Sequence, residues 1–363
     1  MQTKFNEKLF EGQSFYVGID CHKKNWAVTI LGEQYEHKTM SQDPDPEVLA
    51  SYLRKHFPGG DYQAVYEAGF NGFDPCRRLR ELGVNCNVIH AADVPTMNKE
   101  KIHKLDPVDS RKLARSLRSK EFKSIHIPEP ILEADRALVR QRFRVMKDVT
   151  RTKSRVRSLL FQFNINVPDR FTACQTRSWS RVYINWLKEL KLEYGSLKQT
   201  LDNYIQIGEI QRKELLSVNR QVRLLSQTDA YRDNYNLLIS IPGIGFLTAM
   251  TFLVQIGDIR RFKRLDDLCD YIGLVPMMIG SGPKLYVGKM INRGRKELKI
   301  MIIEAAWDAV RMDPALMYRF NELTRRMNKN KAIIRIARKL VSRMRYVLTS
   351  QEPYKVGITG IEL

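Results

Sequence analysis

Four acidic residues stand where their side chains could hold metal ions. Asp20 ends an apolar run, Glu67 follows a short apolar segment, and Asp106 and Asp109 lie three residues apart. Residues at that spacing share one face of a helix. Four carboxylates around one point suit two Mg²⁺ ions, which activate an attacking oxygen and stabilise a leaving one in phosphoryl transfer. The acids therefore indicate metal-dependent phosphate chemistry.

Each acid alone also has an ordinary structural explanation. Asp106 could be a helix N-cap, with Pro107 at the first helical position and Asp109 in the first turn. Asp20 could be a turn residue after a strand, and Glu67 a solvated strand end. Only the order and placement of all four favour a metal site.

A second candidate for chemistry is Ser281, which glycines flank on both sides. An unactivated serine is a poor nucleophile, so it needs a base or metal nearby and cations to balance the phosphate charge. Taken alone, Gly-Ser-Gly-Pro is usually a turn. The cations that follow it are Lys284, Lys289, Arg293 and Arg295.

The acids need a scaffold, and the first third of the chain predicts a ribonuclease H-like α/β sheet. Alternating apolar residues and turn signals give the order βββαβαβ. Strands separated by helices pair in parallel, so the first and fourth strands become neighbours, with Asp20 and Glu67 at their carboxyl ends. The expected elements are strands 15–20, 26–31 and 34–40, helix 46–57, strand 64–67, helix 75–82, strand 84–89 and a helix opened by residues 105–111.

The middle of the chain predicts a basic helical hairpin resembling a coiled coil. Apolar residues recur at three-four spacing in two segments, which pack on each other or on another subunit. Between residues 136 and 157 nine Lys or Arg residues accompany one acid, so we expect contact with phosphates; a solvated helix face is the alternative. The candidate contacts are Arg151, Lys153, Arg155 and Arg157. The first stripe contains Val139, Arg142, Met146, Val149, Lys153, Val156, Leu160 and Phe163, and the second runs from Leu201 to Leu225.

A glycine-bounded turn opens the mainly helical last third. Gly243 and Gly245 have the spacing of a helix-hairpin-helix, in which backbone N–H groups approach a phosphate at a helix N-terminus. A plain turn between two helices is the alternative. Residues 319–345 predict a basic amphipathic helix of uncertain duty.

Composition agrees with a nucleic-acid partner. The chain has 363 residues and a formal net charge of +21, a field that attracts polyanions. It shows no long uncharged apolar run, secretory signal or lipidation motif, so we expect no membrane association and a cytoplasmic, nucleoid-associated protein. The five scattered cysteines predict reduced, mostly structural thiols.

Several of these motifs together resemble the DEDD transposases of the insertion-sequence-110 family. The matching segments are Tyr16 to Lys24, Val65 to Gly69, Lys104 to Ala114, Gly273 to Pro276, Ser281-Gly282, the stretch from Gly288 through Ile291 to Gly294, and Ala305-Ala306. The resemblance implies a RuvC-like domain whose metal-binding acids are Asp20, Glu67, Asp106 and Asp109, with Ser281 as covalent nucleophile. His22 replaces a small or hydroxyl residue of many relatives and is expected beside the site, not as a ligand. Ile279-Gly280 precede Ser281 where many relatives have paired serines.

The resemblance also implies an organisation and partners. It gives a RuvC-like domain at 1–130, a helical connector at 131–230, a serine-bearing domain at 231–350 and a tail at 351–363. A phosphoserine link to DNA would conserve bond energy without ATP. A noncoding bridge RNA would select donor and target DNA. In a dimer or tetramer, the acids of one subunit would meet the serine of another. The alternatives are a RuvC-like structure-specific nuclease that uses water, and a non-catalytic nucleic-acid-binding protein.

Overall fold

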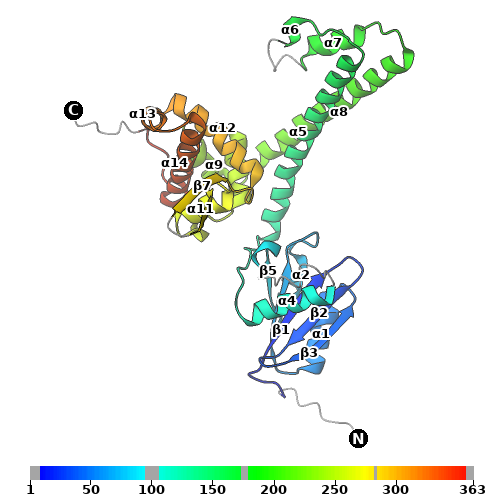
Figure 1. The fold of residues 1–363 in the computed structure, drawn as a ribbon, viewed down its shortest axis with the longest axis vertical. Helices are drawn as coiled ribbons and strands as arrows, with labels where there is room; N and C mark the ends of the chain where they lie inside the picture. The colour runs from blue at the N-terminus through cyan, green and yellow to red at the C-terminus, as the bar shows by residue number, and fades with distance from the viewer. Residues whose placement is uncertain (1–8, 95–105, 173–178, 282–283, 357–363) are drawn as a thin grey trace, which may run out of the picture. The chain divides into compact units, whose positions relative to one another are not determined.

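A computed structural model describes residues 9–94, 106–172, 179–281 and 284–356, with only the backbone described for residues 278–281 and 284–287. The chain forms two compact units, one ending at Pro128 and the other beginning at Glu129 (Figure 1). The first unit is α/β and the second is largely helical, as the sequence predicts.

The first unit contains a mixed five-stranded sheet in the order β3-β2-β1-β4-β5. β1 pairs in parallel with β4, which confirms that the first and fourth strands are neighbours. β1 and β2 form the expected antiparallel hairpin, to which β3 adds. The strands are β1 (Ser14–Cys21), β2 (Trp26–Leu31), β3 (Glu36–Gln42), β4 (Asp61–Glu67) and β5 (Asn85–Ile89).

Helices cover both faces of this sheet. α1 and α2 contribute Leu49, Leu53 and Leu79 to one core, while Leu113 and Leu117 of α4 belong to a separate cluster that contains Val65 of β4. Asp45 caps α1, because its side chain accepts a hydrogen bond from the N–H of Glu47. The helices are α1 (Pro46–His56), α2 (Asp74–Glu81), the 3-10 turn η1 (Ala91–Asp93) and α4 (Asp106–Arg118).

The second unit begins with two long antiparallel helices, α5 (Pro130–Gln162) and α8 (Gly195–Leu225) (Figure 1). The Thr152 hydroxyl donates to the Gln211 side chain over 2.9 Å, and Arg142 donates to Asn219 over 3.2 Å. α6 (Asp169–Thr172) and α7 (Arg181–Glu189) lie in the connection between the long helices. A small core there buries Trp179.

The predicted stripe on the first long helix is partly wrong. Met146 and Phe163 are exposed, and Lys153 is only partly buried, whereas Val145 and Thr152 are buried. The buried face of α5 instead contains these smaller neighbours, of which Thr152 bonds Gln211 of α8. Four positions of the second stripe are buried, namely Leu201, Gly208, Val218 and Val222. Its other four positions are partly buried, namely Tyr204, Gln211, Leu215 and Leu225.

The remaining helices surround one large core. α10 is buried along almost its whole length, and α14 contributes an apolar face that includes Ile336 and Leu340. The basic segment 319–345 is therefore not one surface helix: α13 ends at Thr324 and α14 packs into the core. The elements are α9 (Arg232–Ile239), α10 (Phe246–Ile256), the 3-10 turn η3 (Ile259–Arg261), α11 (Leu265–Ile272), β6 (Pro276–Ser281), β7 (Lys284–Met290), α12 (Lys296–Met312), α13 (Pro314–Thr324) and α14 (Lys329–Ser350).

Among the described residues, no helix has the length and apolar character that a membrane span requires. The four cysteines that can be assessed, Cys21, Cys76, Cys86 and Cys269, are free thiols, as the sequence predicts.

Candidate metal centre and serine hairpin

The sheet brings Asp20 and Glu67 together. Ile19 of β1 stands opposite Tyr66 of β4, so the next residue on each strand, Asp20 and Glu67, follows at the same edge. Their side chains are 25% and 33% exposed. Two half-buried carboxylates thus meet although 46 positions separate them in the chain.

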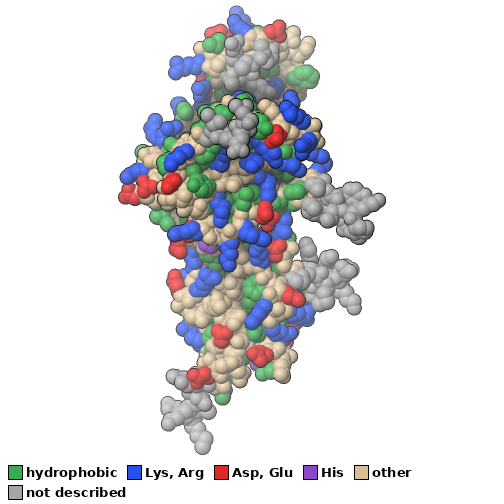
Figure 2. Space-filling model, turned by 90° about the vertical axis from the view of Figure 1, so that its left-hand side faces the viewer, with side chains coloured by type: hydrophobic (Ala, Val, Ile, Leu, Met, Phe, Trp, Pro, Cys, Tyr) green, Lys and Arg blue, Asp and Glu red, His purple; other side chains and the backbone are tan. Residues whose placement is uncertain are grey.

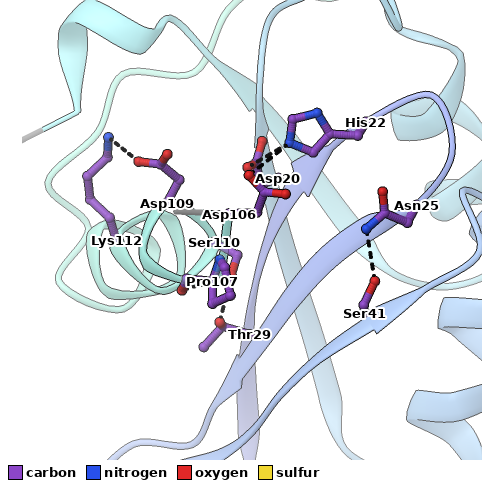
Figure 3. A network of polar contacts seen from close by, with 10 residues as sticks. All are labelled: Asp20, His22, Asn25, Thr29, Ser41, Asp106, Pro107, Asp109, Ser110 and Lys112. Carbon is purple, nitrogen blue, oxygen red and sulfur yellow. Dashed lines mark hydrogen bonds and ion pairs between the residues drawn. The ribbon is translucent and has the colours of Figure 1, made fainter. Parts of the chain in front are cut away.

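Helix α4 adds the other two acids because it lies unusually close to β1. A Cβ atom on Gly18 would stand 2.0 Å from the carbonyl oxygen of Ser110, so only glycine permits this contact. The Ser110 hydroxyl also bonds that of Thr29 on β2 over 2.9 Å in a buried contact. These contacts fix the first turn of α4, which carries Asp106 and Asp109, beside the end of β1 (Figure 3).

The electrostatics of the centre reflect this crowding. Burial raises the pKa of Asp20, and the charges of Asp106 and Asp109 raise it further. Burial likewise raises the pKa of Glu67, and Asp109 and Asp20 add to the increase. The four acids therefore influence one another, and a cation among them would relieve both the repulsion and the loss of solvation.

Two basic side chains already face the acids. His22 Nε2 lies 3.2 Å from an oxygen of Asp20 and 3.4 Å from one of Asp106, and Figure 3 shows its ring directed at both. Lys112, whose side chain is only 12% exposed, has its ammonium 3.5 Å from Asp109 and 3.8 Å from Glu67. The Lys112 ammonium therefore holds positive charge beside the position where a metal cation would bind.

The donor set fits a divalent cation. One potential ligand atom from each of Asp20, His22 and Asp106 lies within 4.8 Å of the others, a separation that a single ion can bridge. Carboxylate oxygens are the ligands that Mg²⁺ prefers. With Glu67 and Asp109 completing the acids, the centre could bind metal and polarise a phosphate.

Sequence reasoning placed the acids but missed much of what positions them. Gly18, Thr29 and Lys112 received no role from their pattern. Gly18 stands two residues before an acid in a strand, and a glycine inside a strand often marks a close backbone approach. That signal could have located the helix that crosses there.

Ser281 lies on a β-hairpin, whereas the sequence around it indicates only a turn. The backbone places Ser281 at the end of β6, opposite Lys284 at the start of β7. The side chains of both residues lie outside the described part of the structure. Apolar and β-branched residues on either side of a Gly-Pro pair explain why the segment pairs as strands.

Two glycines close the base of this hairpin. Gly273 and Gly294 have positive φ angles of 89° and 102°. A Cβ on Gly294 would lie 2.7 Å from the Gly273 nitrogen, and one on Gly273 would lie 2.4 Å from the Arg293 carbonyl oxygen. The two loops therefore pack backbone to backbone, which holds the chain before β6 against the chain after β7.

The predicted helix-hairpin-helix turn joins α9 to α10. Gly245 is the N-cap of α10, and a Cβ there would meet nothing within 4 Å. Gly243, at φ +86°, instead packs against α12, since a Cβ would lie 2.6 Å from the carbonyl oxygen of Ala305. The close approach that requires Gly243 is thus to a helix of the same chain, while Gly245 leaves the N-terminus of α10 open.

The other predicted nucleic-acid contacts are basic side chains of the second unit. Arg151, Arg155, Arg157 and Lys289 are exposed, and burial lowers the pKa of the partly buried Lys153. Arg151 pairs with Asp148, and Arg295 donates to the Tyr271 hydroxyl over 3.0 Å. On the face that Figure 2 shows, Lys and Arg side chains are more widespread than Asp and Glu.

Comparison with known proteins gives matches over both units. Residues 17–165 match a model of DEDD transposases of the IS110 group, and residues 235–322 match the transposase IS116/IS110/IS902 family. The transposase for insertion sequence element IS1533 of Leptospira borgpetersenii is 27% identical over 68% of this chain and 71% of its own length.

Two shorter matches have higher identity. The transposase for insertion sequence element IS1111A of Coxiella burnetii is 33% identical over 32% of this chain and 34% of its own length. The pilin gene-inverting protein of Moraxella bovis is 31% identical over 36% of this chain and 42% of its own length. With both family models matched in order along one chain, this protein belongs to the IS110 family of insertion-sequence transposases.

Proposed function

We propose that this transposase cuts and rejoins DNA with Mg²⁺ held by Asp20, Glu67, Asp106 and Asp109, and with Ser281 as the attacking group. The observation that carries the proposal is the convergence of four acids from two strands and a helix, with raised pKa values at Asp20 and Glu67. Such a cluster is costly unless a cation or a proton neutralises it. Perturbed carboxylates of this kind are typical of functional sites.

The proposed reaction exchanges one phosphodiester for another. The Ser281 oxygen forms a bond to phosphorus as the bond from phosphorus to a sugar oxygen breaks. The serine proton passes to a base, and the leaving sugar oxygen takes up a proton. A sugar hydroxyl of the second DNA strand then attacks the phosphoserine, restores a phosphodiester and releases the serine. When bound, Mg²⁺ would supply Lewis-acid stabilisation of the phosphate charge.

The partners of the reaction are also proposals. We expect donor and target double-stranded DNA, a noncoding bridge RNA that selects both, and a dimer or tetramer in which one subunit's acids serve another's serine. The name of the Moraxella bovis relative says that it inverts a gene, which is consistent with recombination chemistry. A net charge of +21 favours polyanionic partners generally.

The main alternative is a nuclease that uses water, because the acid cluster alone could support hydrolysis. Ser281→Ala separates the two. We expect strand transfer and covalent attachment to vanish on supercoiled donor DNA with Mg²⁺, while the melting temperature stays unchanged. Tyr286→Phe removes a hydroxyl from the same hairpin and is the matched control, which should retain activity. Persistent cleavage by Ser281→Ala would favour the water-using nuclease.

The remaining alternative, a non-catalytic binding protein, is tested with Asp20→Asn. If neither Ser281→Ala nor Asp20→Asn changes DNA chemistry, the protein only binds. The guide proposal has its own test: active preparations should contain a discrete RNA, and ribonuclease treatment should abolish target choice. Activity without any copurified RNA would contradict the guided mechanism.

A further inference from the structure

A basic cavity of about 420 Å³ lies within the second unit. Three helices and a loop form its walls. α5 contributes successive basic residues on one face, and α10 contributes polar residues. The residues that line it are Arg140, Phe143, Arg144, Lys147, Thr251, Gln255, Gly294, Arg295, Lys296, Glu297 and Leu298.

The charge of the lining points to an anionic ligand. Five cationic side chains face one carboxylate, that of Glu297, which pairs with Lys147 over 2.9 Å. Burial lowers the pKa of Arg140, and the nearby charges of Arg295 and Arg144 lower it further. Among the described residues, no side-chain acceptor bonds Arg140 or Arg144. Cations are thus held close together without enough negative charge to balance them.

Two neighbouring arginines differ from Arg140 and Arg144, because they donate hydrogen bonds to backbone carbonyls. Arg136 is 4% exposed and donates to the backbone carbonyls of Val254 and Gln255 at the end of α10. Arg261 donates to the carbonyl of Ile256 over 2.9 Å. Cations at a helix C-terminus stabilise its dipole. Arg136 and Arg261 therefore have a structural role, whereas Arg140 and Arg144 face the cavity.

Two buried polar groups on α10 also face the cavity without partners. Thr251 is 1% exposed and Gln255 is 6% exposed, and neither the Thr251 hydroxyl nor the side-chain amide oxygen of Gln255 has a hydrogen-bond partner among the described residues. A buried polar group without a partner is costly. A ligand that accepts a hydrogen bond from Thr251 would remove that cost, and the Gln255 amide could turn its NH₂ group to the same ligand.

The N-terminus of α12 completes the wall. Arg295 is its N-cap, and the 17-residue helix begins at Lys296, so its first N–H groups and dipole favour an anion there. The Tyr271 hydroxyl accepts a hydrogen bond from Arg295 and donates to the Gln255 carbonyl, which fixes the Arg295 guanidinium. Gly294 also packs on Gly273 at the base of the serine hairpin.

We propose that this cavity binds a backbone phosphate of a nucleic-acid strand, with Arg140, Arg144 and Thr251 as its contacts. An oxyanion with several acceptor oxygens suits a group of cations, a hydroxyl donor and a helix N-terminus at once. Because the cavity adjoins the base of the serine hairpin, a strand held there is anchored beside the segment that carries Ser281. The site requires neither the acids nor the serine chemistry.

The test measures binding of the full-length protein without Mg²⁺, so it does not depend on catalysis. Fluorescein-labelled single-stranded DNA, duplex DNA and RNA of one sequence are titrated by anisotropy at several salt concentrations. Thr251→Val keeps the side-chain shape but removes the hydroxyl. We expect affinity to fall about tenfold, the loss expected for a hydrogen bond to a charged group, while the melting temperature stays equal or rises.

The double variant Arg140→Gln/Arg144→Gln tests the cations. The slope of log affinity against log salt should become shallower by about one to two, since each lost phosphate contact removes about one unit. Arg181→Gln, an exposed arginine outside the cavity, is the matched control and should keep the wild-type slope. A loss confined to DNA or to RNA identifies which strand occupies the site.

Three results would overturn the proposal. Thr251→Val and the double variant could both bind every oligonucleotide as the wild type does. Inorganic phosphate could raise the melting temperature of the wild type but not of the cavity variants, while the variants bind oligonucleotides as the wild type does. Labelled oligoglutamate could lose as much affinity as the oligonucleotides, which would make the cavity a site for acidic peptides.

Discussion

At the scale of single residues, the candidate metal centre is a set of charges that the fold brings together at a cost. Asp20 and Glu67 are partly buried, and their pKa values are raised by burial first and by neighbouring acids second. His22 and Lys112 offset part of that repulsion. Active centres commonly retain such costly arrangements because function requires them.

This cost predicts that Asp20→Asn stabilises the protein when metal is absent. A carboxyl group with a raised pKa favours folding only while protonated, so its ionised form destabilises the fold above that pKa. In EDTA, the variant should melt a few degrees above the wild type at neutral pH, and the difference should shrink as the pH falls through the raised pKa of Asp20.

Mg²⁺ should reverse that order. The wild type should gain melting temperature with Mg²⁺ because the ion binds only the folded state, while Asp20→Asn should gain little. Asp43→Asn changes an exposed acid outside the centre and serves as control. Differential scanning fluorimetry gives both quantities. Equal Mg²⁺ stabilisation of the wild type and Asp20→Asn would contradict a metal site at Asp20.

At the scale of elements, position depends on close backbone contacts. Gly18 lets α4 lie on β1, and Gly273 with Gly294 closes the base of the serine hairpin. In both cases a residue without a side chain determines where a chemically active neighbour stands. A substitution at one of these glycines can therefore displace the site although the glycine itself does not belong to it.

Gly18→Ala should therefore disturb the metal centre without altering any acid. The added Cβ would lie 2.0 Å from the Ser110 carbonyl oxygen, so α4 must move away from β1. We expect a loss of about 1–3 kcal/mol in stability, as for other overpacked sites, together with weaker Mg²⁺ stabilisation. Denaturant unfolding with and without Mg²⁺ measures both.

Gly195→Ala is the matched control for that experiment. A Cβ at Gly195, the first residue of α8, would meet nothing within 4 Å. Its stability should be unchanged or slightly higher, since alanine favours helix. If Gly18→Ala behaves like Gly195→Ala, the contact between α4 and β1 does not position the acids.

The sequence predicted the fold correctly where local sequence signals and tertiary packing favour the same structure. β2 has the predicted limits, and the order of elements in the first unit follows from alternation, Asp45 capping and Pro-Gly breaks. It failed where packing decides among similar side chains: Val145 rather than Met146 is buried. It also missed the contact of Gly18 with Ser110 and that of Lys112 with Glu67, because the two residues of each contact lie far apart in the sequence.

At the scale of the whole molecule, positive charge is spread along the chain rather than confined to one motif. The formal net charge is +21, and α5 carries basic residues from Arg136 to Arg157. Binding of nucleic acid by such a protein releases counterions from the phosphates, and this release is independent of sequence.

Affinity for random duplex DNA should therefore fall steeply with salt. With six to ten phosphate contacts, we expect a loss of about 10³–10⁵ between 50 and 200 mM salt. Fluorescence anisotropy over that range gives the slope directly. A nearly flat dependence would mean that the basic surfaces do not bind the DNA backbone. Arg151, Arg155 and Arg157 would then only form a solvated face of α5.

The central claim is that acids of one unit and a serine of the other act on the same phosphodiester. Its most direct test is to incubate full-length protein with donor DNA and Mg²⁺, denature the mixture, and map the residue that carries the nucleotide by mass spectrometry. The account predicts a phosphoserine at Ser281 that disappears in Asp20→Asn and in EDTA. Attachment at Tyr286, or cleaved DNA with no attached residue, would contradict it.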